Sequence, residues 1–131
     1  MGTLSLVSKE TLADAARSAM AFSYSPYSKF KVGAALLCTS GKIYTGCNIE
    51  NASFGATNCA ERTAIFKAVS EGENEFEAIA IASSGDSPAP PCGICRQVLS
   101  EFAPQIKILL VTTGQIIETS LPEIFGMPFE L

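Results

Sequence analysis

The residues best suited to chemistry are cysteines and a carboxylate at two places in the chain. In NCAERTAIF, Cys59 is followed by Glu61 and Arg62, and PCGIC places Cys92 and Cys95 three positions apart. Alone, a C-x-x-C pair fits a redox dithiol, half of a zinc site or two buried structural cysteines. A redox pair would leave Cys59 unexplained, whereas a metal site can use all three thiols.

Three thiols can form one metal site if the two places converge. Cys59 opens one predicted helix, Cys92 and Cys95 open another, and both helices follow strands and loops. Their N-termini can therefore meet at one edge of a sheet. Thiolate sulfur suits zinc, and three protein ligands leave the fourth tetrahedral position open, as in catalytic zinc sites. The sequence predicts one Zn²⁺ per chain.

The main alternative is a closed structural site with a fourth thiolate. The chain has no histidine, so the fourth ligand would be Cys38 or Cys47. Strand alternation puts Asn48 and Glu50 on one face and Cys47 on the other. Cys38 ends an apolar strand, where a packing role is expected. The pattern favours the open site.

Charge assigns roles to the residues beside Cys59. Zinc (+2) and three thiolates (−3) sum to −1, which weakens the metal as a Lewis acid. Two helix N-termini each contribute roughly half a positive charge. Arg62 is either an exposed surface arginine or a donor to thiolate sulfur, and the negative site favours the donor. Glu61 alone would be assigned to balancing the helix dipole, but beside the metal it can take a proton from water and return it elsewhere.

The elements that position these residues follow from periodicity and turn signals. A helix is expected after the N-cap Ser8, and a hairpin within residues 32–50 turns at Thr39–Lys42. The order of elements predicts an α/β fold with one mixed sheet flanked by helices. The other expected segments are helices over 59–71 (closed by Gly72), 92–103 and 121–125, and strands over 77–83, 106–111 and 115–119.

Size and composition narrow the class of protein. The 131 residues suit a single domain over residues 1–131, and 47% hydrophobic against 17% charged residues predicts a large core or burial against further copies. A net charge of −4 without a basic cluster argues against a nucleic-acid polymer as partner. Apolar runs are too short for a membrane span, and MGTLSLVSKE lacks the pattern of a signal peptide. We expect a cytoplasmic protein with reduced cysteines.

The combination of CAE with PCGIC resembles the signature of zinc-dependent nucleoside and nucleobase deaminases. With YSPYSKFKVGAAL, GCNIENASF and PCGICRQVL, nearly the whole chain resembles the small homotetrameric cytidine deaminases. The resemblance implies a three-layer α/β/α sandwich with a five-stranded mixed sheet. It implies that Cys59, Cys92 and Cys95 hold zinc, that Glu61 shuttles protons, and that Arg62 bonds the thiolates.

The same resemblance implies a set of substrate contacts. Asn48 and Glu50 of CNIEN would hold ribose hydroxyls, which suits an amide and an acceptor on one strand face. Phe30 would contact the pyrimidine and the Ala60 backbone would bond the base. Phe125 would cap the base in a neighbouring subunit's site.

The implied activity is hydrolytic deamination of cytidine and deoxycytidine, in pyrimidine salvage, by a homotetramer. Phe54 stands where relatives often carry Tyr, so a hydroxyl that could reach an adjoining subunit's site is missing. One alternative is deamination of another small aminopyrimidine compound such as blasticidin S, against which the N-x-E pair argues. Others are a polynucleotide-editing deaminase, disfavoured by the acidic composition, and a non-catalytic zinc module, disfavoured by Glu61.

Overall fold

A computed structural model describes Leu4 and residues 6–131 of the chain. The expected absence of a signal peptide concerns the N-terminal segment, of which residues 1–3 and 5 lie outside the described residues. Within the described part, no helix combines the length and apolar character needed to cross a membrane.

A five-stranded sheet in the order β2-β1-β3-β4-β5 forms the centre of the molecule. Neighbouring strands are antiparallel except β3 and β4, which are parallel and joined through a helix. The predicted mixed sheet is confirmed. The strands are β1 (Val32–Cys38), β2 (Ile43–Cys47), β3 (Phe76–Ser83), β4 (Lys107–Val111) and β5 (Ile116–Ser120).

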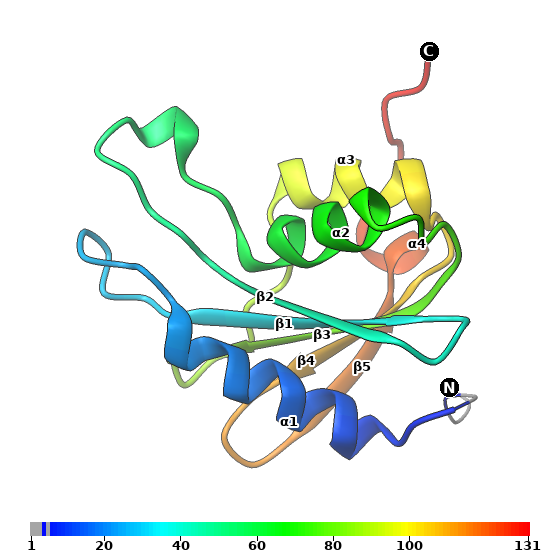
Figure 1. Cartoon of the computed structure of the whole chain (residues 1–131), viewed down its shortest axis with the longest axis horizontal. Coiled ribbons are helices and arrows are strands. Elements are labelled where there is room, and N and C mark those ends of the chain that lie inside the picture. Colours follow the sequence, from blue (N-terminus) through cyan, green and yellow to red (C-terminus); the bar gives the residue numbers. More distant parts are fainter. Residues whose placement is uncertain (1–3, 5) are drawn as a thin grey trace.

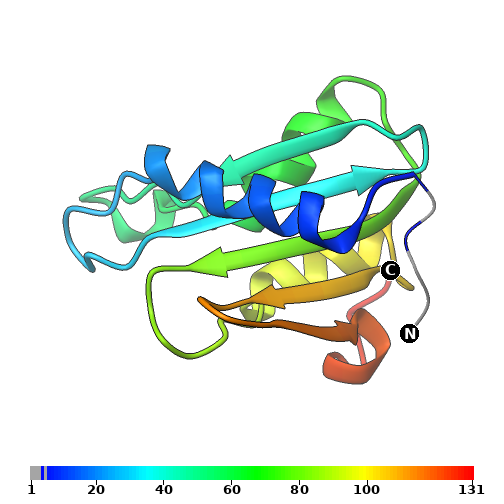
Figure 2. The same ribbon diagram turned by 90° about the horizontal axis from the view of Figure 1, so that it is seen from below.

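Helices cover both faces of this sheet, which confirms the predicted three layers (Figures 1 and 2). Helix α1 (Lys9–Ala19) lies on one face. The opposite face carries α2 (Ala60–Ser70), α3 (Gly93–Phe102) and the short α4 (Leu121–Ile124). Two single-turn 3₁₀ helices, η1 (Met20–Phe22) and η2 (Phe54–Ala56), lie in the connections.

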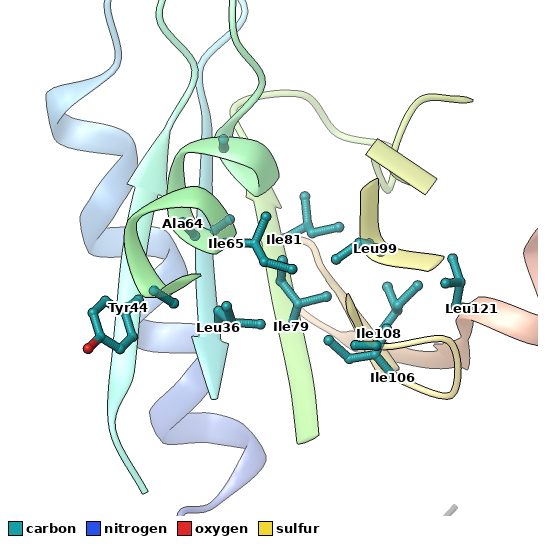
Figure 3. Packing of buried hydrophobic residues seen from close by; sticks show 14 of the residues in the cluster. Leu36, Tyr44, Ala64, Ile65, Ile79, Ile81, Leu99, Ile106, Ile108 and Leu121 are labelled. Atoms are coloured by element: carbon teal, nitrogen blue, oxygen red, sulfur yellow. The ribbon is translucent and has the colours of Figure 1, made fainter. Parts of the chain in front are cut away.

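Alternation along the strands divides the core between the two faces. Leu36 and Ile79 of the sheet pack with Leu99 of α3 (Figure 3). On the other face of the sheet, Leu37 packs with Leu12 of α1. Burying each such side chain stabilises the fold by about 1.5–3 kcal/mol. The apolar cluster under α2 and α3 thus fixes both helices against the same face of the sheet.

Local signals in the sequence account for the helix and turn boundaries. Ser8 accepts a hydrogen bond from the Thr11 N–H at 3.1 Å and caps α1. Gly72 follows α2 with φ of 98°, and Gly41 has φ of 95° in the β1–β2 turn. Both backbone conformations favour glycine.

The second strand of the hairpin is shorter than predicted. It ends at Cys47, the last partner of β1 through Gly33, so Asn48 and Glu50 lie beyond it. Ile49 instead forms isolated bridges with Tyr24 and Asn58. The chain remains extended but pairs with a loop, a tertiary contact that the alternation of residue types does not encode.

Candidate active site

The N-terminus of α2 presents Cys59. Cys59 is the N-cap residue with extended backbone angles, and its side chain makes no capping hydrogen bond. The helix lies very close to β2, because a Cβ on Gly46 would come within 2.6 Å of the Ala60 carbonyl oxygen and the Ala64 nitrogen. This close approach fixes the first turn of α2 and the side chains that it carries.

The N-terminus of α3 presents the other two thiols. Cys92 is the N-cap residue, is exposed, and likewise makes no capping hydrogen bond through its side chain. Cys95 is buried in the first turn. The predicted placement of all three thiols at two helix N-termini is confirmed.

The sulfur atoms of Cys59, Cys92 and Cys95 lie within 4.8 Å of one another. The Cys59 and Cys92 sulfurs are 3.7 Å apart. Two thiolates each about 2.3 Å from a tetrahedral zinc are roughly 3.8 Å apart, so the cluster has the dimensions and the soft donors that zinc requires. The residues present therefore fit the predicted ion.

The two remaining cysteines lie elsewhere. Cys38 is fully buried in the core cluster between β1 and the helices. Cys47 lines a different cavity of about 480 Å³, together with Phe22 of η1 and Lys67 of α2. Among the described residues, no fourth His, Cys, Asp or Glu joins the three thiols. The arrangement fits the predicted open site.

Hydrogen bonds distribute charge unevenly among the thiols. A hydrogen bond with the Cys95 thiol, and to a smaller extent hydrogen bonds with Arg62 and Cys92, lower the pKa of Cys59 to about 5. The Arg62 Nη2 donates to the Cys59 sulfur at 3.3 Å, as predicted. The pKa of Cys95 is raised, first by its hydrogen bond to Cys59 and then by burial. Of the hydrogen-bonded pair Cys59 and Cys95, Cys59 thus has the lower pKa, and Arg62 faces its negative charge.

Glu61 is a buried carboxyl group beside the thiols. It is 5% exposed, and burial raises its pKa to about 7, with the nearby Cys59 charge acting in the same direction. A carboxyl group with a strongly perturbed pKa in a cavity is typical of a proton-transferring residue.

A cavity of about 260 Å³ joins Glu61 to the residues predicted to contact substrate. Phe125 is the exception: it lies outside this lining and packs, partly buried, against the core cluster. The structure places the other candidates together, and their individual roles stay predictions. The lining includes Phe30, Asn48, Glu50, Cys59, Ala60, Glu61 and Cys92.

Asn48 has a bonding role that sequence reasoning missed. Its Oδ1 accepts hydrogen bonds from the Val32 N–H at 2.9 Å and the Ser23 hydroxyl at 2.5 Å. Its Nδ2 donates to the Phe30 carbonyl at 2.8 Å. One amide side chain therefore holds both ends of the loop that carries Phe30.

Glu50 supports the same loop. Its Oε1 accepts hydrogen bonds from the backbone N–H groups of Tyr27 at 2.9 Å and Ser28 at 3.1 Å. The Ser28 hydroxyl donates to Oε2 and is the main reason that the pKa of Glu50 is lowered. These contacts join residues distant in sequence, and only the turn-forming YSPYS hints at them.

Comparison with known proteins gives a consistent result. The family description "Cytidine and deoxycytidylate deaminase zinc-binding region" matches residues 7–112. The chain is 48% identical to a cytidine deaminase of Sporosarcina psychrophila, over 92% of this chain and 90% of the relative. It is 51% identical to a cytidine deaminase of Halalkalibacterium halodurans, over 81% and 82%. The crystal structure of cytidine deaminase from Burkholderia pseudomallei matches with a TM-score of 0.90 at 43% identity, covering 94% of this chain and all of that one.

Proposed function

The chain belongs to the cytidine and deoxycytidylate deaminase zinc-binding family, and on that basis we propose that it deaminates cytidine and deoxycytidine hydrolytically. The products are uridine or deoxyuridine and ammonia, as in pyrimidine salvage. The observation that carries this proposal is the buried Glu61 in a cavity beside the sulfurs of Cys59, Cys92 and Cys95.

The reaction requires water to add to C4 of the ring and the amine to leave. Zinc, which Cys59, Cys92 and Cys95 would hold, would supply a Lewis acid that lowers the pKa of a water molecule. Glu61 accepts the proton of the attacking water and delivers it to N3 of the ring. It then takes the proton of the new C4 hydroxyl and passes it to the amine as the bond between C4 and nitrogen breaks, so that C4 becomes a carbonyl, N3 keeps its proton and ammonia leaves. Its burial suits this exchange, because a carboxyl group shielded from bulk water passes the proton directly between the attacking water, N3 and the amine.

Arg62 and the two helix N-termini offset the negative charge of the centre. Zinc (+2) and three thiolates (−3) together carry a charge of 2 − 3 = −1, which would otherwise weaken zinc as an electrophile. Arg62 donates to the Cys59 sulfur and withdraws electron density from that ligand. The N-termini of α2 and α3 add partial positive charge at Cys59 and Cys92.

The cavity supports a nucleoside as substrate. Phe30 and the Ala60 backbone border the space for the base. The second N–H of Asn48 and the Glu50 carboxylate offer a donor and an acceptor for the sugar hydroxyls. The described lining contains Glu50 and Glu61 but no Lys or Arg, which disfavours a 5′-phosphate.

A homotetramer is the proposed assembly. The described surface exposes the apolar side chains of Phe22, Phe54, Met127 and Phe129, and covering such side chains commonly drives self-association. We propose that Phe125 caps the base in a neighbouring subunit's site and that Phe54, lacking a hydroxyl, makes only apolar contact there. Light scattering at micromolar concentration checks the assembly, and a monomeric mass would refute it.

We also propose a cytoplasmic location. All five cysteines are free thiols, which suits a reducing compartment.

The direct experiment follows the loss of cytidine absorbance with purified protein before and after zinc is removed, and again after zinc is restored. Turnover should vanish and return. Blasticidin S assayed in parallel distinguishes a related aminopyrimidine deaminase, and a binding assay with single-stranded RNA or DNA tests a polynucleotide substrate. Zinc-loaded protein that does not turn over cytidine would refute the proposed function.

A further inference from the structure

Arg96 lies on α3 one residue after Cys95 and bonds two separate segments of backbone. Its Nε donates to the Pro91 carbonyl at 2.8 Å, and its Nη1 donates to the Ile124 carbonyl at 3.2 Å. The side chain is partly buried. None of the ion pairs among the described residues involves Arg96. The bonds described for its guanidinium therefore go to carbonyl oxygens.

The first of these bonds acts on the backbone of a thiol ligand. The Pro91 carbonyl belongs to the same planar peptide group as the Cys92 N–H. Fixing that carbonyl fixes the plane of the peptide that enters Cys92. Cys92 has no capping hydrogen bond from its side chain, is exposed, and lies outside any strand at the end of the loop that follows β3. The Cys92 carbonyl also accepts the helix bond from the Arg96 N–H at 2.9 Å, so the Arg96 side chain adds a second restraint on the backbone of this exposed cysteine.

The second bond anchors the C-terminal segment to the same helix turn. Helix α4 has four residues, so its last carbonyls lack partners within the helix. The Ile124 carbonyl finds its partner in Arg96. Gln97, the next residue, binds the tail separately: its amide accepts from the Phe129 N–H at 3.0 Å and donates to the Phe129 carbonyl at 2.9 Å.

We propose that Arg96 is a positioning residue for the metal centre, holding Cys92 in place through the Pro91 carbonyl. This inference rests on the zinc site of the proposed function. Residues that orient metal ligands typically change metal affinity by about 10–100-fold when replaced. Arg96 differs from Arg62 in acting on the ligand's backbone, whereas Arg62 acts on ligand sulfur.

The test measures zinc release to an excess of a chromogenic chelator from wild type, Arg96→Gln, Arg96→Lys and Gln97→Ala. Zinc content is measured first. Arg96→Gln should release zinc about tenfold faster. Arg96→Lys keeps the charge but replaces the two guanidinium nitrogens that bond the carbonyls by one ammonium group, so its release rate should lie between those of Arg96→Gln and wild type. Gln97→Ala loses only the two hydrogen bonds to the Phe129 backbone and should release zinc at the wild-type rate. For Arg96→Gln, kcat should fall with the KM for cytidine unchanged.

The outcomes separate this inference from the proposed function. Wild type that holds no zinc contradicts the proposed function. Wild type that holds zinc, with Arg96→Gln releasing it at the same rate, overturns the role of Arg96 alone. Equal acceleration in Gln97→Ala also overturns it, because loss of tail anchoring would then explain the effect. If Arg96→Gln does not fold, Arg96→Lys decides: release at the wild-type rate overturns the role.

Discussion

The N-termini of α2 and α3 are alike in design and differ in what their arginines bind. Each begins with a cysteine whose side chain makes no capping bond, and each carries an arginine one turn later. On α2, Arg62 donates to the sulfur of Cys59. On α3, Arg96 donates to the carbonyl that precedes Cys92. The α2 end thus adjusts the charge of its ligand, whereas the α3 end adjusts the position of its ligand.

Packing reinforces this difference. The α2 end is pressed against β2 at Gly46 and contains the buried Glu61. At the α3 end Cys92 is exposed, and a Cβ on Gly93 would meet nothing within 4 Å. Electrostatic effects are strongest where water is excluded, so proton transfer is assigned to the α2 end. The more open α3 end needs a restraint from a side chain.

Replacing Glu61 by Gln should give the largest effect on the α2 side of this comparison. Loss of a general acid and base lowers kcat by about 10²–10⁴-fold. Zinc content should remain that of wild type, because the three thiols are unchanged. The matched control is Glu71→Gln at the other end of α2, where the carboxylate accepts a hydrogen bond from the Tyr44 hydroxyl outside the cavity. Retained turnover in Glu61→Gln would rule out the proton shuttle.

Replacing Arg62 by Gln should give the next largest effect. The Cys59 thiolate would lose its charged donor, leaving the centre more negative and the electrophile weaker. We expect the fold to persist and kcat to fall about 10–100-fold, with an altered pH profile of the rate. Lys67→Gln, on the same helix, is the control, since Lys67 donates to the Thr45 carbonyl and lines a cavity that contains none of Cys59, Cys92 and Cys95. An unchanged rate and pH profile would contradict the charge argument.

Replacing Gly46 by Ala tests how closely α2 is fixed. The new methyl group would meet the Ala60 carbonyl, so the helix must shift, at a cost of about 1–3 kcal/mol in the free energy of unfolding. Turnover should fall with it, because Glu61 is in the displaced turn. Gly93→Ala at the start of α3 should change little. Denaturant unfolding measures both, and equal stability of the two variants would remove the packing difference between the helix ends.

Replacing Ser28 by Ala, on the side of the cavity assigned to the sugar, should give the smallest effect, a change in stability that depends on pH. The Ser28 hydroxyl is the largest cause of the lowered pKa of Glu50. A carboxyl group whose pKa is lowered in the folded protein stabilises the fold at pH values above its ordinary pKa of 4.5. This stabilisation is lost as the pH falls through the pKa of the folded state. The stability difference between wild type and Ser28→Ala should therefore be present at pH 6 and shrink as the pH falls below 4.5.

A matched control for Ser28→Ala is available on α3. The Ser100 hydroxyl donates to the Gln97 carbonyl, which does not titrate. Thermal unfolding of Ser100→Ala should differ from wild type by the same amount at each pH. A Ser28→Ala difference that does not vary with pH would contradict the assigned cause of the Glu50 shift.

Local patterns predicted the parts of the site that depend on helix starts. Cys59 and Cys92 are N-cap residues, as the strand-loop-helix order predicted, and Gly72 closes α2. Residue types and spacing sufficed because capping and helical periodicity are properties of neighbouring residues. The spacing also predicted that Glu61 would lie beside Cys59.

Contacts between a side chain and a distant backbone could not be predicted in this way. Asn48 was assigned to substrate only, yet it holds Val32 and Phe30 in place. Arg96 gave no signal, since one arginine within an amphipathic helix resembles any partly exposed residue. The end of β2 at Cys47 was missed because pairing with a loop depends on tertiary structure.

The most direct test of the account is X-ray absorption at the zinc edge on active protein, with elemental analysis of the same sample. Three thiolates from Cys59, Cys92 and Cys95 and one open position predict one zinc per chain, with three sulfur neighbours at about 2.3 Å and one lighter oxygen neighbour. Four sulfur neighbours, or active protein without zinc, would contradict it.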